Sequence, residues 1–150
     1  MQRGMLGSVL SLLLLAAPAA GHGPGVDAER AVEIYEQWLQ FYADREPENA
    51  IAMTTRSFIM VNNEQVLNRE EALAFTQQLR DFILSRECEN RVVASKRSGF
   101  GGRLLLSRVD CVFQTVQGEL EASFLETVLI NRWGRITYDH FTDVADPSLP

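Results

Sequence analysis

Two pairs of side chains in this sequence could do chemistry: two cysteines, and an acid with a histidine. Cys88 and Cys111 are the only cysteines, and they lie symmetrically about residues 98–101, a short segment between two β-rich stretches. A four-residue hairpin loop at this segment would place Arg97 opposite Gly102. Counting back in step then brings Cys88 opposite Cys111. Opposed residues on antiparallel strands lie close enough for a disulfide, so the pair predicts both a bond and a strand register.

The predicted register also assigns side chains to the two faces of the sheet. Tight turns at residues 117–118 and 132–134 carry it into two further strands. The face that carries the cysteines is mostly apolar, so we expect it to pack against helices. Glu126 and His140 are polar exceptions on this face, and the register places them directly opposite each other. Burial raises the pKa of a carboxyl and a neighbouring imidazole favours its charged form, so they are a candidate acid–base pair.

A structural alternative for this pair stays open. One β-bulge between Glu119 and His140 would move either residue of the pair to the other face. Separately from a bulge, the structural alternative makes Glu126 a rim residue that pairs with an arginine and His140 a hydrogen-bonded core histidine.

Aromatic side chains could complete a cavity around the pair. The alternative is that they simply form the core. The candidate ligand contacts are Tyr35, Trp38, Tyr42, Phe58, Phe124 and Tyr138.

Two helices and a short strand are predicted to come first. Asp27 can cap a helix that runs to about Ala43, with a broad apolar stripe at helical spacing. Pro47 suits the first turn of a short helix over residues 47–54. Residues 57–61 then read as a short strand.

The second half of the domain is predicted to be a third helix followed by four strands. Asn68 and Glu71 have the spacing of a capping box, which opens a helix to about Arg86. The strands are predicted at residues 90–97, 102–116, 119–131 and 135–144. Helices on one side of an antiparallel meander define an α+β domain, whose sheet must curl to bury the helical aromatic residues.

The ends and the charge of the chain limit its location and partners. Residues 1–21 have the form of a cleaved signal peptide, with an apolar run too short to span a membrane comfortably. We expect residues 22–26 to be a flexible leader, 27–145 one domain and 146–150 a tail. Secretion agrees with a disulfide. The net charge is −6 without a basic run, so neither nucleic acid nor, after signal cleavage, a membrane is an expected partner.

Two histidines and no recognised metal or phosphate motif lead us to expect neither a metal nor a cofactor. The face opposite the cysteines is richer in leucine than a solvated sheet face, which predicts a homodimer packed through it. These leucines are Leu104, Leu106, Leu125 and Leu129. On the same face, Arg91, Arg108 and Asp110 can form a cross-strand charge cluster.

The last predicted strand carries the most specific sequence pattern. Residues 133–143 read WGRITYDHFTD, which is similar to the closing strand of SnoaL-type members of the nuclear transport factor two-like superfamily. The earlier helices also resemble that superfamily, and the resemblance covers nearly all of residues 27–144. It implies a cone-shaped, cystatin-like roll in which three N-terminal helices pack on a curved antiparallel sheet.

The resemblance also implies roles for residues by position. Cyclase-like members use an acid–base group near the closing strand, where His140 and Asp139 stand here. Ketosteroid isomerases use a helix-one tyrosine and an acid as oxyanion donors, and Tyr35 or Tyr42 could fill the tyrosine role. They also use a carboxylate just after the short strand. Residues 61–63 are Val-Asn-Asn here, which argues against steroid isomerase chemistry.

Three functions are therefore weighed. The leading one is a secreted domain that holds a small apolar molecule in its cone, as a binding or accessory module. The first alternative is an isomerase or cyclase that uses His140 and Glu126 as a general acid–base pair. The second is a homo-oligomeric assembly module that works through its leucine-rich outer face.

Overall fold

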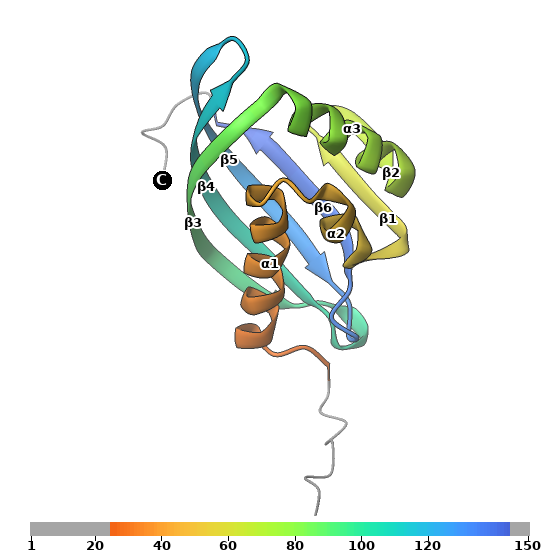
Figure 1. Cartoon of the computed structure of the whole chain (residues 1–150). Coiled ribbons are helices and arrows are strands. Elements are labelled where there is room, and N and C mark those ends of the chain that lie inside the picture. The colour runs from red at the N-terminus through yellow and green to blue at the C-terminus, as the bar shows by residue number, and fades with distance from the viewer. Residues whose placement is uncertain (1–24, 145–150) are drawn as a thin grey trace, which may run out of the picture.

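The structure is a computed structural model that describes residues 25–144 (Figure 1). The predicted signal peptide, most of the predicted leader and the predicted tail lie outside the described residues. The elements are α1 (Ala28–Ala43), α2 (Pro47–Ala52), β1 (Thr54–Asn62), β2 (Gln65–Asn68), α3 (Arg69–Phe82), β3 (Ile83–Arg97), η1 (Gly99–Gly101), β4 (Arg103–Thr115), β5 (Gly118–Ile130) and β6 (Ile136–Asp143). No helix within residues 25–144 has the length and apolar character needed to cross a membrane.

Side-chain caps fix where the two longer helices begin. The Asp27 carboxylate accepts a hydrogen bond of 2.8 Å from the backbone N–H of Arg30, at the start of α1. At the start of α3, Asn68 and Glu71 form the predicted capping box, in which each side chain accepts from the other residue's backbone N–H. These caps satisfy N–H groups that have no partner inside the helix.

Six strands form one sheet in the order β2-β1-β6-β5-β4-β3. Its β3 edge curves around α1, and the helices lie on one side of it (Figure 1). The α+β class and the curved sheet are as predicted. The sheet is mixed rather than wholly antiparallel, because β1 runs parallel to β6. The chain can make this parallel pair because α3 and the rest of the sheet lie between β1 and β6 in sequence.

The two cysteines pair as predicted. Cys88 lies opposite Cys111 on β3 and β4, and the two form a disulfide with Cα atoms 4.1 Å apart. Nearer the loop, Arg97 pairs with Arg103 rather than with the predicted Gly102, and a bulge after Val92 restores the predicted register at the cysteines. The cysteines therefore gave the correct register for the half of the hairpin in which they lie.

The third helix is shorter than predicted. It ends at Phe82 instead of Arg86, and β3 begins at Ile83. The backbone N–H of Val116 donates to the carbonyl of Phe82, and Ile83 pairs with Thr115, so the start of β3 finds its backbone partners on the hairpin. Pairing to β4 thus overrides the helical preference of this segment, and it places the Arg86 side chain on the inner face, in step with Cys88.

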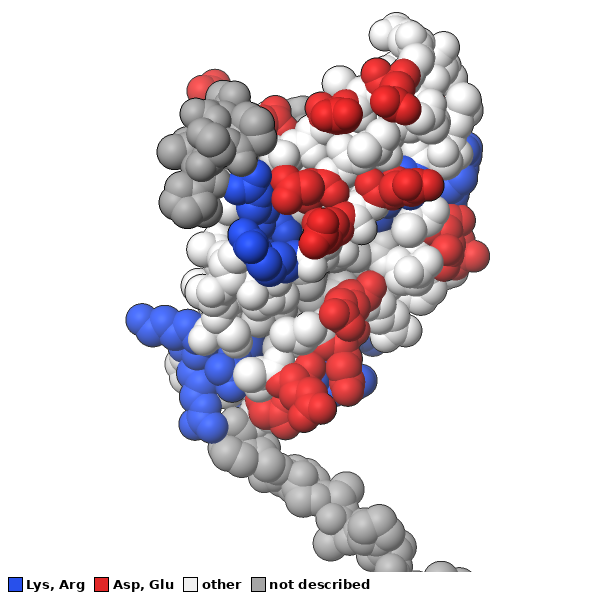
Figure 2. Space-filling model, turned by 90° about the vertical axis from the view of Figure 1, so that its left-hand side faces the viewer, with Lys and Arg blue, Asp and Glu red and all other residues white. Residues whose placement is uncertain are grey.

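The strand β3 is one edge of the sheet, and its exposed side chains are largely charged. Figure 2 looks onto this side of the molecule and shows acidic side chains spread over it, with basic side chains toward its left and right margins. Exposed residues of β3 with charged side chains are Glu87, Glu89, Arg91, Lys96 and Arg97. Charges along an edge strand discourage pairing with the edge of another molecule.

Candidate functional site

An apolar cavity of about 140 Å³ lies between the helices and the inner face of the sheet. Its walls come from α1, α3 and five strands. The side chains that line it are Trp38, Leu39, Tyr42, Met60, Phe75, Thr76, Leu79, Ile83, Arg86, Val109, Cys111, Phe113, Phe124, Glu126, Asp139 and Phe141. Most are aliphatic or aromatic, and three carry ionisable groups: one arginine and two acids.

The two acids are buried together in the cavity wall. Glu126 on β5 is 7% exposed and Asp139 on β6 is 1% exposed. Glu126 pairs with Phe141 and Asp139 pairs with Val128, so the acids are diagonal neighbours on adjacent strands. The hydroxyl of Tyr35, from α1, donates a hydrogen bond to Oε2 of Glu126. Tyr35, Glu126 and Asp139 therefore form one buried cluster.

Burial raises the pKa of both acids, because a charged carboxylate is poorly solvated inside the protein. For Asp139 the negative charge of Glu126 acts in the same direction and holds the pKa well above its usual value. For Glu126 the hydrogen bond from Tyr35 opposes the upward shift of the pKa. Asp139 is therefore the acid of the pair whose protonated form is more strongly favoured.

Both helix-one tyrosines stay neutral and can act as donors. Burial raises the pKa of Tyr35 and of Tyr42, and the acids raise both further by Coulombic repulsion. Tyr35 is fully buried and reaches the site through its hydroxyl, whereas Tyr42 lines the cavity directly.

The predicted pairing of Glu126 with His140 is wrong. Leu129 pairs with Tyr138, whereas the next residue, Ile130, pairs with Ile136. Thr137 is therefore an extra residue on β6, and β6 bulges at this point. Beyond the bulge His140 pairs with Thr127 on the outer face, where its ring lies 3.1 Å from the Thr142 hydroxyl. A shift of one residue moves each side chain of a strand to the opposite face of the sheet. Asp139 therefore lies on the inner face, where His140 was predicted.

The six predicted ligand contacts fall into different environments. Trp38, Tyr42 and Phe124 line the cavity, and their role as ligand contacts stays a prediction. Phe58 is 1% exposed and belongs to the hydrophobic core instead. Tyr138 is moved to the outer face by the same bulge and lies beside His140, with 6.3 Å between the ring centroids.

Unpaired polar atoms gather around this cavity. Five buried side-chain N or O atoms in the described part of the chain have no hydrogen-bond partner, and four of them belong to cavity-lining residues. The four are Trp38 Nε1, Tyr42 Oη, Arg86 Nε and Asp139 Oδ1. A buried polar atom without a partner is unusual and costs about 1–3 kcal/mol. The lining therefore offers more hydrogen-bond donors than the protein itself satisfies.

Arg86 is the functional candidate that the sequence analysis missed, since the segment around it was expected to be helical. Its guanidinium lies over the ring of Tyr42, 5.7 Å from the centroid, and Nη2 donates to the carbonyl of Leu39. The strand register that follows from the disulfide could have predicted the position of Arg86. If Cys88 faces Cys111 on the inner face, a strand continued by two residues places Arg86 on that face, opposite Phe113.

Within residues 25–144, no group of three or more His, Cys, Asp or Glu residues is placed to hold a metal ion. The chemistry that the described site can supply is hydrogen bonding and proton transfer by the acid pair, in an apolar setting.

Solved structures of other proteins share this fold. A ketosteroid isomerase-like protein from Erwinia carotovora atroseptica superposes with a TM-score of 0.68 at 10% identity, over 81% of this chain and 100% of that one. The pinacolase BvnE from Penicillium brevicompactum gives a TM-score of 0.68 at 12% identity, over 79% and 88%. AusH from Aspergillus nidulans gives 0.64 at 14% identity, over 79% and 86%.

No family model and no curated protein matches the sequence. At identities this low, structural likeness establishes the fold alone. The chain shares the fold of these structures, which agrees with the curved α+β roll that the closing-strand pattern implied.

Proposed function

We propose that this protein binds a small, mainly apolar molecule that carries a hydrogen-bonding oxygen. The observation that carries the proposal is the concentration of unpaired polar atoms around one apolar cavity. Three of the four atoms, on Trp38, Tyr42 and Arg86, belong to groups that can donate. An acceptor oxygen brought in by a ligand would give such donors a partner and recover their desolvation cost.

The volume of the cavity indicates the size of the part that is buried. An engineered apolar cavity of about 150 Å³ in another protein binds benzene. The cavity here is about 140 Å³, so it suits a single six-membered ring with a small substituent.

The acid pair indicates where the oxygen of the ligand lies. Oδ1 of Asp139 has no partner, and Asp139 is the acid that keeps its proton. A neutral carboxyl donates to a carbonyl oxygen without the cost of burying a second charge. A ketone or aldehyde oxygen directed at Asp139 therefore fits this site better than a hydroxyl or an amine would.

Acetophenone and ethylbenzene form a matched pair for the test, because they differ mainly in the carbonyl oxygen. Calorimetric titration of the wild-type protein should give tighter binding of acetophenone. In Asp139→Ala acetophenone should bind about tenfold more weakly, and ethylbenzene should be little changed. Failure of both compounds to bind, or equal binding of both, would refute the proposal.

A second candidate function is isomerase-type proton transfer. It is favoured by two neighbouring carboxyl groups that ionise at different pH values, since such pairs divide acid and base roles. Asp139 would donate to the carbonyl oxygen while the Glu126 carboxylate removes a proton from the adjacent carbon. Incubation of acetophenone in D₂O tests this directly. If the protein exchanges the methyl hydrogens of acetophenone for deuterium and Glu126→Gln abolishes this exchange, the protein is an enzyme. If exchange is no faster than in buffer, only the binding function is supported.

We also propose that the protein works outside the cytoplasm. The Cys88–Cys111 disulfide supports this location, because such a bond persists in an oxidising compartment. Intact-mass analysis of protein from its own source tests it. A processed N-terminus and a mass two hydrogens below the dithiol form are expected, and an unprocessed dithiol would contradict the proposal.

The outer face of the sheet supports a homodimer, with a second copy of this chain as the partner. Leu104, Val112 and Leu125 are between 36% and 39% exposed there. Arg108 and Asp110, 3.2 Å apart on the same face, offer both signs of charge to a two-fold related copy. Sedimentation of wild type against Leu125→Glu tests this. We expect a wild-type dimer and a monomeric variant, and a monomeric wild type would remove the proposal.

A further inference from the structure

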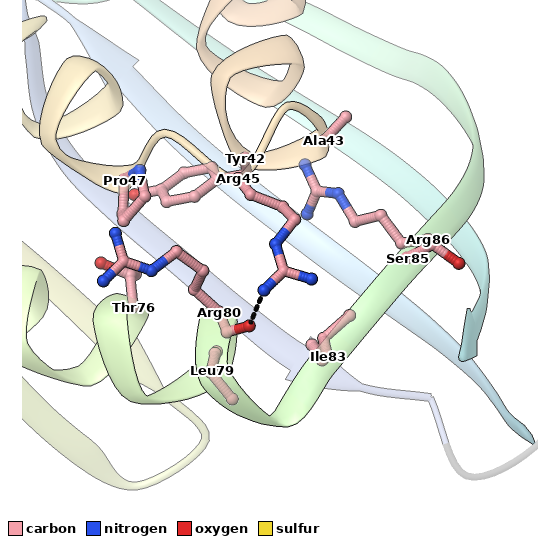
Figure 3. A pocket seen from close by; sticks show the side chains of 10 residues that line it. All are labelled: Tyr42, Ala43, Arg45, Pro47, Thr76, Leu79, Arg80, Ile83, Ser85 and Arg86. Carbon is pink, nitrogen blue, oxygen red and sulfur yellow. Dashed lines mark hydrogen bonds between the residues drawn. The ribbon is translucent and has the colours of Figure 1, made fainter. Parts of the chain in front are cut away.

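A second hollow of about 70 Å³ adjoins the apolar cavity. It lies between the end of α1, α2, the end of α3 and the start of β3 (Figure 3). The two spaces share the lining residues Tyr42, Thr76, Leu79, Ile83 and Arg86. A molecule with its ring in the cavity can therefore extend a substituent into this hollow.

Three arginines line the hollow, and two of them are committed to the protein itself (Figure 3). Arg45 donates to the carbonyl oxygens of Leu84 and Arg80 at 2.7 and 3.0 Å. Arg80 contacts a carboxylate oxygen of Glu48 at 3.2 Å. These two guanidinium groups mainly tie the α1–α2 connection and α3 together.

Arg86 is the third arginine, and its capacity to donate is largely unused. Among the residues that the structure describes, only its Nη2 finds a hydrogen-bond partner, the Leu39 carbonyl, and its Nε is buried without one. No carboxylate in residues 25–144 lies within 4 Å of it, although Glu126 and Asp44 act on it through space. A half-buried cation that lacks a close counter-ion stands at the junction of the two spaces.

We propose that the bound molecule carries a carboxylate, which pairs with Arg86 while the ring occupies the apolar cavity. This inference rests on the proposed binding function and specifies the class of ligand: an aromatic keto acid of about one ring. A guanidinium presents parallel N–H groups that match the two oxygens of a carboxylate. The aliphatic part of the cavity would hold the ring, Asp139 the carbonyl oxygen and Arg86 the anionic end.

The charges around Arg86 determine on which side of its guanidinium a carboxylate can bind. Negative charge on Glu126 acts on Arg86 through space and would also repel a nearby anion, whereas the protonated form of Asp139 would not. The carboxylate therefore belongs on the outer side of Arg86, toward the second hollow, where the walls are formed by Pro47, Leu79 and the other arginines. Arg45 and Arg80 add positive potential at that end.

4-Acetylbenzoate and its methyl ester form the probe pair, because they share the ring and the ketone and differ in charge. In wild type the acid should bind at least about tenfold more tightly than the ester. In Arg86→Met the acid and the ester should bind equally, while the ester keeps its wild-type affinity. Arg86→Lys should keep part of the preference, since lysine retains the positive charge but lacks the two parallel N–H groups of the guanidinium. Arg91→Met, at an exposed arginine of β3 that lines neither space, is the matched control and should keep the full preference.

The outcomes separate this inference from the proposed function. If the ester binds to wild type as tightly as the acid, the inference of a carboxylate that pairs with Arg86 is overturned, while the proposed binding of an apolar molecule stands. A preference for the acid that survives in Arg86→Met equally overturns it. If neither compound binds, the proposed function and this inference fall together. Should Arg86→Met fail to fold, the wild-type comparison and Arg86→Lys still decide the matter.

Discussion

Glu126 and Asp139 share the inner face of the sheet because Thr137 is an extra residue on β6. Without that bulge His140 would face Glu126, and Asp139 would point away from the helices. The bulge replaces the histidine by a second acid, so two carboxyl groups lie together in the site instead of an acid and an imidazole. It also explains why Tyr138 and His140 lie together on the outer face.

His140 should therefore be dispensable for binding. Its side chain is half-buried outside the cavity, and its one side-chain hydrogen bond is to Thr142. We expect His140→Ala to change the free energy of unfolding by at most about 0.5 kcal/mol and to leave the affinity for acetophenone unchanged. Urea unfolding and calorimetry check this. A large loss of affinity in His140→Ala alone would place the histidine back in the site.

The pKa of Asp139 makes stability depend on pH. Its folded pKa is raised above the unfolded value of about 3.9, so its contribution to stability is present below about pH 4 and is lost as the pH rises through the folded pKa. Wild type should lose stability relative to Asp139→Asn over that range, by up to about 1.4 kcal/mol per pH unit.

Urea unfolding of both proteins between about pH 4 and pH 8 measures the difference. Glu121→Gln, an exposed acid on β5, is the control and should parallel wild type. If the Asp139→Asn and wild-type curves also run parallel, Asp139 does not carry a perturbed pKa.

The disulfide should contribute substantially to the stability of the hairpin that closes the cavity. It links residues 23 apart in sequence, for which loop-closure entropy gives about 3 kcal/mol. Cys111 also lines the cavity, so reduction should weaken the binding of acetophenone as well. Urea unfolding with and without a reductant tests this, with Cys88→Ser/Cys111→Ser as the permanent form. An unchanged midpoint would show that the hairpin holds its register without the bond.

Phe58 and Phe124 should behave differently when shortened. Phe58 is 1% exposed in the core, so Phe58→Ala should destabilise the protein by about 3–5 kcal/mol. Phe124 lines the cavity and is only partly buried, so Phe124→Ala should cost less stability and instead reduce the affinity for ethylbenzene. Unfolding and titration of both variants check this. Equal loss of stability in the two would mean that Phe124 is also a core residue.

Much of the fold could be predicted from local signals. Asp27 and Asn68 cap helices in the way their side chains favour, and Gly134, in the predicted turn at residues 132–134, has a left-handed backbone with φ +75°. The cysteines gave the register of their hairpin because a disulfide requires two specific residues to be neighbours. Each of these signals depends on a few residues that are close in sequence or covalently joined.

The candidate site was harder to predict because it depends on where the chain departs from regularity. Nothing in the side chains around Thr137 distinguishes a bulged strand from a regular one, yet the bulge decides whether Asp139 or His140 faces inward. Arg86 was missed for a related reason. Its segment has helical preference, and only pairing with distant residues of β4 turns it into a strand.

The protonation state of Asp139 is the most direct test of the account. Carbon-13 NMR of protein labelled at the aspartate carboxyl carbons follows each carboxyl through a pH titration. At about pH 6 exposed aspartates are ionised, and we predict one aspartate signal that is still protonated and that disappears in Asp139→Asn. If every aspartate carboxyl in the wild-type protein is ionised at that pH, Asp139 has no proton to donate to a carbonyl oxygen, and the proposed contact with the ligand is contradicted.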